Sequence, residues 1–359
     1  MTRITFYITN HGYGHASRNI PIIIRLLEKN PDLYVDVKTD AIRCGFIKRN
    51  LENYANRIKY YDDCTEVGFI LKKGTLIPDV SQMQYEIERD QARWGTYFQQ
   101  ETEYLRKERP QLVVADVVSW AIRAASQMRI KSLLIGNFTW DQMYRYFLDE
   151  KYWMPYYENY KMAERAIWYE PHASVLDGYC AHTQQCSMVT RKIDDKIVKA
   201  IKSQCSLPIV FVSYGGSMEL TQEVNVEHLP YVFFITKGVR LAGCNVHCLP
   251  SDMINTPDYI AAADYIIAKG GWSTVAEILL QRKKCALIFR RDNPEDNITK
   301  GILEQRGHCI QIQEEELIDI GSIIKKIDRL VPENYDMYYD STEKISNIIM
   351  EMAGGGNAI

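Results

Sequence analysis

The sequence predicts an α/β protein with two tandem doubly wound domains, in which helices cover both faces of each parallel sheet. One observation is that apolar, β-branched runs alternate with helix-like segments almost throughout the chain. Such alternation is typical of buried parallel strands joined by helical crossovers. The other observation is length, because 359 residues are too many for one comfortable core and suit two domains of ordinary size.

The first half of the chain carries strand-like and helix-like runs in turn. Strands are expected at 4–9, 33–39, 57–61, 112–116 and 131–136. Helices are expected at about 16–29, 42–51, 82–108 and 119–128. The first domain is therefore expected to cover residues 1–195, and it contains a stretch rich in Tyr and Trp at 150–171.

The second half repeats this scheme. Strands are expected at 207–212, 232–235, 245–249, 265–268 and 285–289. Helices are expected near 218–226, 273–281, 295–305 and 314–330. The second domain should cover 196–335, and a C-terminal helix and tail should occupy 336–359. Ligands of open α/β sheets bind outside the carboxyl ends of the strands, so the turns after these strands are the places to look for chemistry.

Composition argues against several classes of protein. The 43 basic and 46 acidic side chains nearly balance, which disfavours nucleic-acid binding and a strongly basic membrane face. The start of the sequence lacks the apolar core of a signal peptide, and no apolar run nears the roughly 20 residues that span a bilayer. We therefore expect a cytoplasmic protein without a membrane span, although a peripheral membrane contact stays open. Nine scattered cysteines indicate reduced, packed thiols without a metal site.

The turn after the first strand, HGYGH at 11–15, is the first candidate site. Its glycines let the backbone approach a ligand, and the helix that follows offers N–H groups to an anion. The dinucleotide fingerprint G-x-G-x-x-G is not met, because Ser17 stands at its last position. His15 can act as a general base near neutral pH, or it can cap the helix or bind phosphate. The residues alone leave these roles open, and His11 is the weaker catalytic candidate.

A glycine-rich turn also follows the strand expected at 207–212. Its residues are Gly215, Gly216 and Ser217. Glycines with a hydroxyl at a helix start suit a phosphate group, but a simple tight turn gives the same letters. Taken alone, this turn is a weak signal.

A stronger signal follows the strand expected at 265–268. The residues of interest are Lys269, Gly270, Gly271, Ser273, Thr274 and Glu277. Glycines followed by a Ser or Thr cap make an anion-binding helix start. Glu277, one turn into the helix, would repel a phosphate, so the hydroxyls of a ribose are its natural partners. Together these residues suggest a nucleotide, with its diphosphate on the helix end and its ribose on Glu277.

The next strand ends in a polar cluster that contains Arg291, Glu295, Asp296 and Asn297. Such groups can bind sugar hydroxyls and balance diphosphate charge, and the acidic pair also suits a helix start; neither role excludes the other. In the first half, Asp116 ends an apolar strand and faces either a ligand or the cap of the next helix. No Asp-x-Asp pair occurs, so the commonest acidic motif for a metal-bridged diphosphate is missing. We expect a metal-independent reaction with no cofactor besides the donor substrate.

Four segments, in this order, resemble a known family. They are YITNHGYGHASR at 7–18, LVVADVVSWAIRAA at 112–125, IGNFTWDQMY at 135–144 and AKGGWSTVAEILLQRKKCALIFRRDNPED at 268–296. They look like the two-domain glycosyltransferases of the GT-B fold. The resemblance is greatest to the branch that contains the lipid-linked N-acetylglucosamine transferase of peptidoglycan synthesis, and to the transferase-like N-terminal half of plant arabinose kinases.

The resemblance implies two Rossmann-like domains that face a cleft, the first on the acceptor side and the second binding a nucleotide sugar. It implies that His15 is the base or a contact to donor phosphate at that cleft. The glycines that would meet the donor there are Gly12 and Gly14. The implied diphosphate contacts are Gly215, Gly216, Ser217, Gly271, Ser273 and Thr274. Glu277 would hold the ribose, Glu295 and Asp296 would hold the donor sugar, and Lys269 stands where related transferases often have histidine.

The implied reaction is inverting, metal-independent transfer of a hexosyl group from a nucleotide diphosphate donor, expected to be a UDP-sugar, to an unidentified acceptor hydroxyl. One rival is a nucleotide-sugar hydrolase of the pseudaminic acid pathway, which also carries G-x-G-H followed by a basic residue, as Arg18 is here. Its histidine activates water in place of an alcohol. A catalytically silent sugar-nucleotide-binding protein is the third alternative, because a fold alone does not establish a function.

Overall fold

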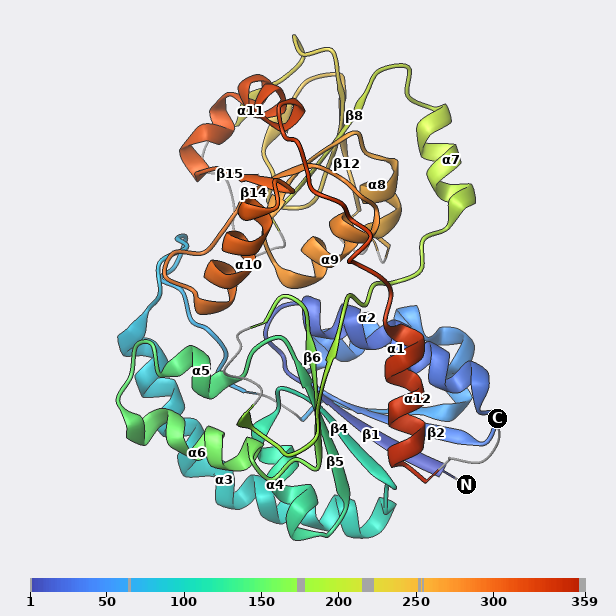
Figure 1. The fold of residues 1–359 in the computed structure, drawn as a ribbon, viewed down its shortest axis with the longest axis vertical. Helices are drawn as coiled ribbons and strands as arrows, with labels where there is room; N and C mark the ends of the chain where they lie inside the picture. Colours follow the sequence, from blue (N-terminus) through green and yellow to red (C-terminus); the bar gives the residue numbers. More distant parts are fainter. Residues whose placement is uncertain are drawn as a thin grey trace. The chain divides into compact units, whose positions relative to one another are not determined.

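The structure is a computed structural model that describes residues 2–63, 66–172, 178–214, 223–250, 253 and 255–354. These residues form two compact units (Figure 1). Unit 1 is drawn from Met1–Ile70, Pro78–Val189 and Asp340–Ile359, and unit 2 from Leu71–Ile77 and Thr190–Tyr339. The division differs from the expected domains at the boundaries, which fall at 189–190 and 339–340 in place of 195–196 and 335–336, and in the placement of two segments. The segment 71–77 packs with unit 2, and the C-terminal helix packs with unit 1.

The centre of unit 1 is a parallel sheet of seven strands in the order β3-β2-β1-β4-β5-β6-β7. The strands are β1 (Thr2–Ile8), β2 (Leu33–Lys38), β3 (Ile58–Tyr61), β4 (Leu112–Asp116), β5 (Lys131–Gly136), β6 (Arg165–Tyr169) and β7 (Thr183–Cys186). Every residue of β4 is buried, because helices cover both faces of the sheet. β1 and β4 are neighbours, and Ile8 lies opposite Asp116, so their carboxyl ends meet.

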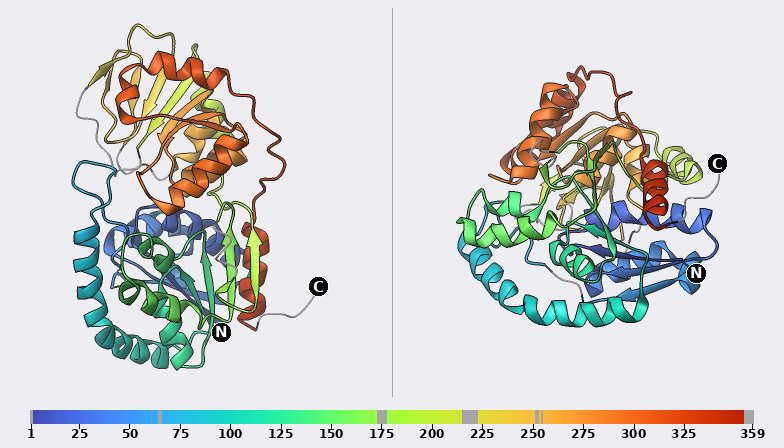
Figure 2. Two further views of the ribbon diagram at one scale, coloured as in Figure 1. Left: turned by 60° about the vertical axis from the view of Figure 1, so that its left-hand side comes forward. Right: turned by 60° about the horizontal axis from the view of Figure 1, so that its bottom comes forward.

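Helices pack on both faces of this sheet (Figure 2). They are α1 (Gly14–Lys29), α2 (Ala41–Asn50), η1 (Glu52–Arg57), α3 (Val80–Glu108), α4 (Ser119–Gln127), α5 (Trp140–Tyr144), α6 (Glu150–Tyr160) and α12 (Thr342–Met352). α1, α2 and α12 form one group, and α3, α4, α5 and α6 form another. Glu343 of α12 makes ion pairs with Arg25 and Lys29 of α1, which joins the end of the chain to its beginning.

Unit 2 is built around a parallel sheet of six strands in the order β12-β10-β8-β13-β14-β15. The strands are β8 (Ile209–Ser213), β10 (Val232–Ile235), β12 (Val246–Cys248), β13 (Tyr265–Lys269), β14 (Cys285–Ile288) and β15 (Cys309–Gln311), and a separate short pair is β9 (Val224–Asn225) with β11 (Leu241–Ala242). The helices are α7 (Asp195–Ser203), α8 (Pro257–Ala262), α9 (Trp272–Leu280), α10 (Pro294–Gln305), η3 (Glu314–Ile318) and α11 (Ile320–Asp328). Leu76 joins the apolar core of this sheet, which explains why 71–77 belongs to unit 2.

Two expected helices of the second half differ from the structure. The helix expected at 218–226 is wrong at its end, because Val224–Asn225 is strand β9, while 218–222 lie outside the described residues. The helix expected at 314–330 is interrupted at Asp319. The Asp319 side chain accepts a hydrogen bond of 3.0 Å from the backbone N of Ser322 and so caps α11. A good capping residue inside an apolar helical pattern therefore starts a new helix.

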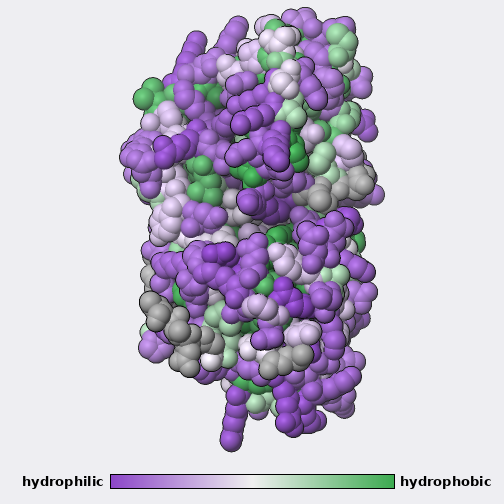
Figure 3. Space-filling model, turned by 90° about the vertical axis from the view of Figure 1, so that its right-hand side faces the viewer, coloured by the Kyte–Doolittle hydropathy of each residue, from purple (hydrophilic) through white to green (hydrophobic). Residues whose placement is uncertain are grey.

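Hydrophilic residues predominate on the face of the molecule drawn in Figure 3, where hydrophobic ones are scattered. Exposed large apolar side chains such as Ile42 and Val331 come from distant parts of the chain. In the part of the chain that the structure describes, no helix is both long and apolar enough to cross a membrane.

Candidate functional site

The carboxyl edge of the unit 1 sheet gathers the first group of candidate residues. His15 lies in the first turn of α1, directly after β1, and Asp116 is the last residue of β4. Gly12 has a φ of 72°, a left-handed conformation that glycine adopts at little cost. Gly14 is the first residue of α1. The tight turn therefore places His15 beside the carboxyl end of the neighbouring strand, β4.

His15 and Asp116 form a buried pair. The Nδ1 atom of His15 lies 2.8 Å from Oδ1 of Asp116. The exposed fraction is 6% for His15 and 0% for Asp116. The His15 ring also packs edge-on against Phe138, with 5.6 Å between the ring centroids. Asp116 does not cap the next helix, because the N-cap residue of α4 is Val118.

Two further side chains of α1 hold the Asp116 carboxylate. Arg18 donates from Nε to Oδ2 at 2.8 Å and from Nη2 to Oδ1, and Asn19 donates from Nδ2 to Oδ2 at 2.6 Å. Arg18 also donates from Nη1 to Oδ1 of Asn137, after β5, at 2.8 Å. Burial alone would raise the pKa of Asp116, but attraction to Arg18 and His15 outweighs it and lowers the pKa to about 2. The carboxylate is therefore ionised at neutral pH.

The charge on Asp116 decides the tautomer of His15. Asp116 Oδ1 and Arg18 Nη2 both lie 2.8 Å from His15 Nδ1. One ring nitrogen cannot donate and accept at once. Because an ionised carboxylate only accepts, Nδ1 carries the hydrogen, and Arg18 directs its own N–H to Asp116. The lone pair of the neutral ring is then on Nε2, the arrangement of a histidine base that a carboxylate orients.

The residue after Asp116 has a strained backbone. Val117 has a φ of 55°, which is rare for a β-branched residue. Its carbonyl oxygen accepts a hydrogen bond of 2.6 Å from the hydroxyl of Tyr160 on α6. The aromatic segment therefore fixes the chain at the point where β4 ends, and with it the position of Asp116.

Glu66 is a second buried carboxyl group at this edge, and nothing in the sequence singled it out. Trp140 donates from Nε1 to its Oε2 at 2.8 Å, and the backbone N of Ser119 donates to its Oε1 at 3.3 Å. The backbone N of Glu66 donates to Oδ1 of Asn10 at 2.9 Å. Burial raises the pKa of Glu66 to about 8, so the group is mostly protonated at neutral pH.

His11, the other histidine of the first turn, packs against the loop at 66–69. Its ring lies edge-on to Trp140, with 5.3 Å between the centroids, and its Nδ1 is 3.4 Å from the backbone N of Phe69. A Cβ atom on Gly68 would lie 2.7 Å from Nδ1 of His11. These contacts give His11 a packing role, and its part in catalysis stays a prediction.

In unit 2, the turn between β13 and α9 leaves space at a helix start. Gly271 is the N-cap residue of α9, so the cap is not the hydroxyl of Ser273 or Thr274 that the sequence suggested. A Cβ atom on Gly271 would meet nothing within 4 Å. One on Gly270 would lie 2.2 Å from the ring of Phe289. Gly270 is thus needed for packing, whereas there is space for a methyl group at Gly271, directly before the helix start where a phosphate would bind.

A buried ion-pair group lies beside Lys269, the last residue of β13. Arg290 donates from Nη2 to Oε2 of Glu295 at 2.8 Å and from Nε to Oδ2 of Asp296 at 3.0 Å. Burial, together with repulsion from Arg290, lowers the pKa of Lys269 to about 8, and the two carboxylates oppose this shift. Lys269 still carries most of its positive charge at neutral pH.

Glu277 of α9 pairs with an arginine from the start of unit 2. The Nη2 atom of Arg191 lies 3.3 Å from Oε1 of Glu277 and donates to Oγ1 of Thr256 at 3.2 Å. Glu277 is buried, and burial raises its pKa, while Arg191 opposes that shift. Arg191 therefore favours the ionised form of Glu277, which is the form that accepts hydrogen bonds from hydroxyls.

Solved glycosyltransferases match this arrangement of sheets and helices. No family model matches the chain. UGT89C1 of Arabidopsis thaliana, complexed with UDP, matches with a TM-score of 0.62 and 12% identity, over 99% of this chain and 96% of its own. MurG of Acinetobacter baumannii gives a TM-score of 0.55 and 12% identity, over 98% and 100%. The protein has the GT-B fold.

A third GT-B structure agrees, and so does one sequence relative. UGT73P12 of Glycyrrhiza uralensis, complexed with glycyrrhetinic acid 3-O-monoglucuronide, gives a TM-score of 0.60 and 12% identity, over 99% of this chain and 91% of its own. L-arabinokinase of Arabidopsis thaliana is 22% identical over 98% of this chain. The chain spans about a third of that protein, 34% of its length. The expected GT-B fold and the resemblance on which it rested are confirmed.

Within the GT-B fold, the other expected site residues lie as follows. Gly215, Gly216 and Ser217 fall outside the described residues. Arg291 and Asn297 are exposed. No three side chains of the His, Cys, Asp or Glu type gather to hold a metal in the described part of the chain. The metal-independent reaction stays a prediction.

Several residues of the site escaped the sequence analysis. They are Asn19, Glu66, Asn137 and Arg191. Asn19 had a usable signal, because it follows His15 by four residues and so shares its helix face. The others meet partners through the tertiary fold, as Arg191 meets Glu277 across 86 residues of sequence. No local pattern encodes such pairs.

Proposed function

We propose that the protein is an inverting, metal-independent glycosyltransferase that moves a hexosyl group from a nucleotide diphosphate donor, of the UDP-sugar type, to an acceptor hydroxyl. The observation that carries the proposal is the buried pair of His15 and Asp116, with His15 Nδ1 2.8 Å from the carboxylate. The GT-B fold supports it, because the chain shares that fold with a UDP complex.

In the proposed reaction, Nε2 of His15 takes the proton of the acceptor hydroxyl. The acceptor oxygen then forms a bond to the anomeric carbon of the donor, and the bond from that carbon to the diphosphate oxygen breaks. A single displacement of this kind inverts the anomeric centre. Asp116 stabilises the imidazolium that forms, because its carboxylate is ionised and accepts from Nδ1.

In unit 2, the proposed donor contacts bind the leaving group. The start of α9 would accept the diphosphate, and the Lys269 ammonium would balance its growing charge. Glu277, held by Arg191, would accept hydrogen bonds from the ribose hydroxyls. Asp296 accepts three hydrogen bonds from Arg290, and Glu295 accepts one, so Glu295 is the better candidate of the acidic pair for the donor sugar.

The test follows UDP-glucose by proton NMR, with and without a mixture of sugar and phenol acceptors. We expect a new β-linked product only with acceptor, and a loss of rate of about a hundredfold or more in His15→Ala and in Asp116→Asn. The exposed His182 gives the matched control, since His182→Ala should keep the wild-type rate.

The same assay separates the alternatives. Rapid release of free glucose without acceptor would make the protein a nucleotide-sugar hydrolase, because water would then replace the alcohol. Donor binding without turnover under any condition would make it a silent binding protein. Equal rates in wild type and His15→Ala would contradict the proposed role of His15.

A further inference from the structure

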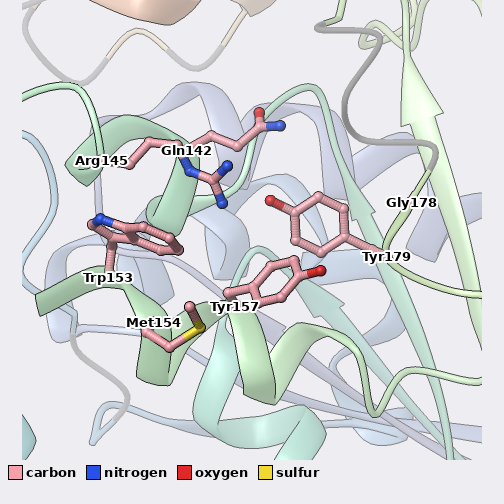
Figure 4. Close-up of a pocket in the computed structure, with 7 residues that line it drawn as sticks. All are labelled: Gln142, Arg145, Trp153, Met154, Tyr157, Gly178 and Tyr179. Carbon is pink, nitrogen blue, oxygen red and sulfur yellow. The ribbon is translucent and has the colours of Figure 1, made fainter. Parts of the chain in front are cut away.

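Unit 1 contains a pocket of about 320 Å³ (Figure 4). It is lined by residues of α5 and α6, by Arg145 after α5, and by Gly178 and Tyr179. Trp153, Met154 and Tyr157 belong to the stretch rich in Tyr and Trp, whereas Gln142 and Arg145 precede that stretch and Gly178 and Tyr179 follow it. A volume near the lower end of roughly 300–1,000 Å³, the range of small-molecule pockets, suits a ligand of one or two rings.

The side of the pocket near α6 is flat and aromatic. The guanidinium carbon of Arg145 lies 4.4 Å from the centroid of the Trp153 ring and 5.9 Å from that of Tyr157. The Tyr157 ring packs edge-on against Tyr179, with 5.5 Å between the centroids. Figure 4 shows these side chains facing one another around the pocket. Flat aromatic surfaces of this kind bind rings by stacking.

The charge exposed in the pocket is positive. Arg145 Nη2 lies 2.8 Å from Oδ2 of Asp141, and the Tyr179 hydroxyl donates to the same oxygen at 2.6 Å. The Asp141 side chain is 0% exposed, whereas that of Arg145 is 39% exposed. Among the described residues, Asp141 is the hydrogen-bond partner of the Arg145 guanidinium, which has five N–H donors in all. Its remaining donors can bind a carboxylate, with two parallel hydrogen bonds.

Three consecutive residues connect this pocket to His15. Asn137 accepts a hydrogen bond from Arg18, and Phe138 packs against the His15 ring. Thr139 donates from Oγ1 to the Tyr179 hydroxyl at 3.0 Å, so the next residue along touches the pocket wall. The pocket and the proposed base therefore both border one short loop after β5.

We propose that this pocket binds a ring compound that carries one carboxylate, with the ring on Trp153 and Tyr157 and the carboxylate on Arg145. On the proposed transfer reaction, this compound is the acceptor, and its hydroxyl is the group that His15 deprotonates. The second statement rests on the proposed function, whereas the binding does not. A phenolic acid and a sugar acid share the required chemistry.

The test is a titration by saturation-transfer-difference NMR with 4-hydroxybenzoate and with glucuronate, each beside its neutral methyl ester. We expect saturable binding of at least one acid, about tenfold weaker binding of its ester, and a similar loss in Arg145→Gln. Arg145→Lys should lose less, because it keeps the charge. Arg123, which stacks on Phe98 at 4.6 Å outside the pocket, gives the matched control, and Arg123→Gln should bind as wild type.

Trp153→Leu is the second variant, which keeps Arg145 and Asp141 and removes the stacking face. Its circular dichroism and that of Arg145→Gln should match wild type. The proposal is overturned if neither acid binds at about 10 mM, a concentration on the order of the weakest useful dissociation constant. It is also overturned if ester and acid bind alike, or if Arg123→Gln and Arg145→Gln weaken binding of the acid equally. UDP titrated into Arg145→Gln reports on the donor site separately, so failure of one proposal does not imply failure of the other.

Discussion

The surroundings of two buried carboxyl groups of unit 1 shift their pKa values in opposite directions. Asp116 receives hydrogen bonds from Arg18 and Asn19, and its pKa falls to about 2. Glu66 is buried among neutral donors, and its pKa rises to about 8. Separated pKa values of this kind mark acid and base roles in enzymes. Here they leave one fixed negative charge beside His15 and one neutral carboxyl group near the same sheet edge.

The raised pKa of Glu66 predicts how stability depends on pH. A folded pKa of about 8 against an ordinary 4.5 means that the folded state binds the extra proton between these values. Stability contributed by this group is therefore lost as pH rises from 4.5 to 8. The substitution Glu66→Gln removes the titrating group and with it this loss of stability. We expect the free energy of unfolding of the variant, relative to wild type, to rise by on the order of 3 kcal/mol between pH 4.5 and pH 7.

Urea unfolding at a series of pH values measures this difference. The matched control is the exposed Glu304 of α10, whose Glu304→Gln variant should keep a constant offset from wild type. A pH-independent offset for Glu66→Gln would show that Glu66 titrates normally in the folded protein.

At the scale of elements, two adjacent glycines of the β13–α9 turn have different roles: Gly270 is needed for packing, and Gly271 is proposed to lie at the ligand. A Cβ atom at Gly270 would lie 2.2 Å from Phe289, so Gly270→Ala should destabilise the fold by about 1–3 kcal/mol. Gly271→Ala meets nothing within 4 Å and has a φ of −73°, so it should leave stability nearly unchanged. On the proposed function, the added methyl group at 271 should instead weaken UDP binding.

Thermal melting and UDP titration of both variants give the comparison. A large loss of stability in Gly271→Ala, or undiminished UDP binding by it, would contradict this division of roles.

Most strands could be predicted, because the apolar, β-branched runs that mark them are local features of the sequence. The bounds expected at 112–116, 131–136 and 232–235 agree with the structure to the residue. The helices α5 and α6 were not expected, since aromatic side chains crowd that stretch and obscure the helical period. The short strand β9 was mistaken for helix, because its pairing with β11 involves a segment 17 residues further on.

Individual contacts of the candidate site were predictable only when they were local or lay at the ends of neighbouring strands. His15 and Asp116 could be proposed because parallel strands bring their carboxyl ends to one edge. The sequence could not show that Arg290, and not Arg291, is the partner of Asp296, because both arginines follow the same strand. Their opposite exposure is decided by the turn that follows, in which Asp292 has a φ of 52°.

At the scale of the whole molecule, each unit carries one part of the proposed chemistry. Unit 1 holds the proposed base, its carboxylate and the aromatic pocket, and unit 2 holds the start of α9 with Lys269 and Glu277. Residues 71–77 belong to unit 2 although the segments before and after them belong to unit 1. The last segment of the chain belongs to unit 1 again, where α12 packs on α1. Sequence order alone could not predict these returns, since they depend on which core a few apolar side chains, such as Leu76, complete.

The central claim is that unit 2 binds the nucleotide of a sugar donor through the start of α9 and Glu277. The most direct measurement is a calorimetric titration with UDP, beside the diphosphates of thymidine, guanosine and adenosine, for wild type, Glu277→Gln and the control Glu304→Gln. We predict saturable binding of UDP that Glu277→Gln weakens about tenfold, as loss of a charged hydrogen-bond acceptor should, and that Glu304→Gln leaves intact. Absence of binding by every diphosphate, or equal binding by both variants, would contradict the claim.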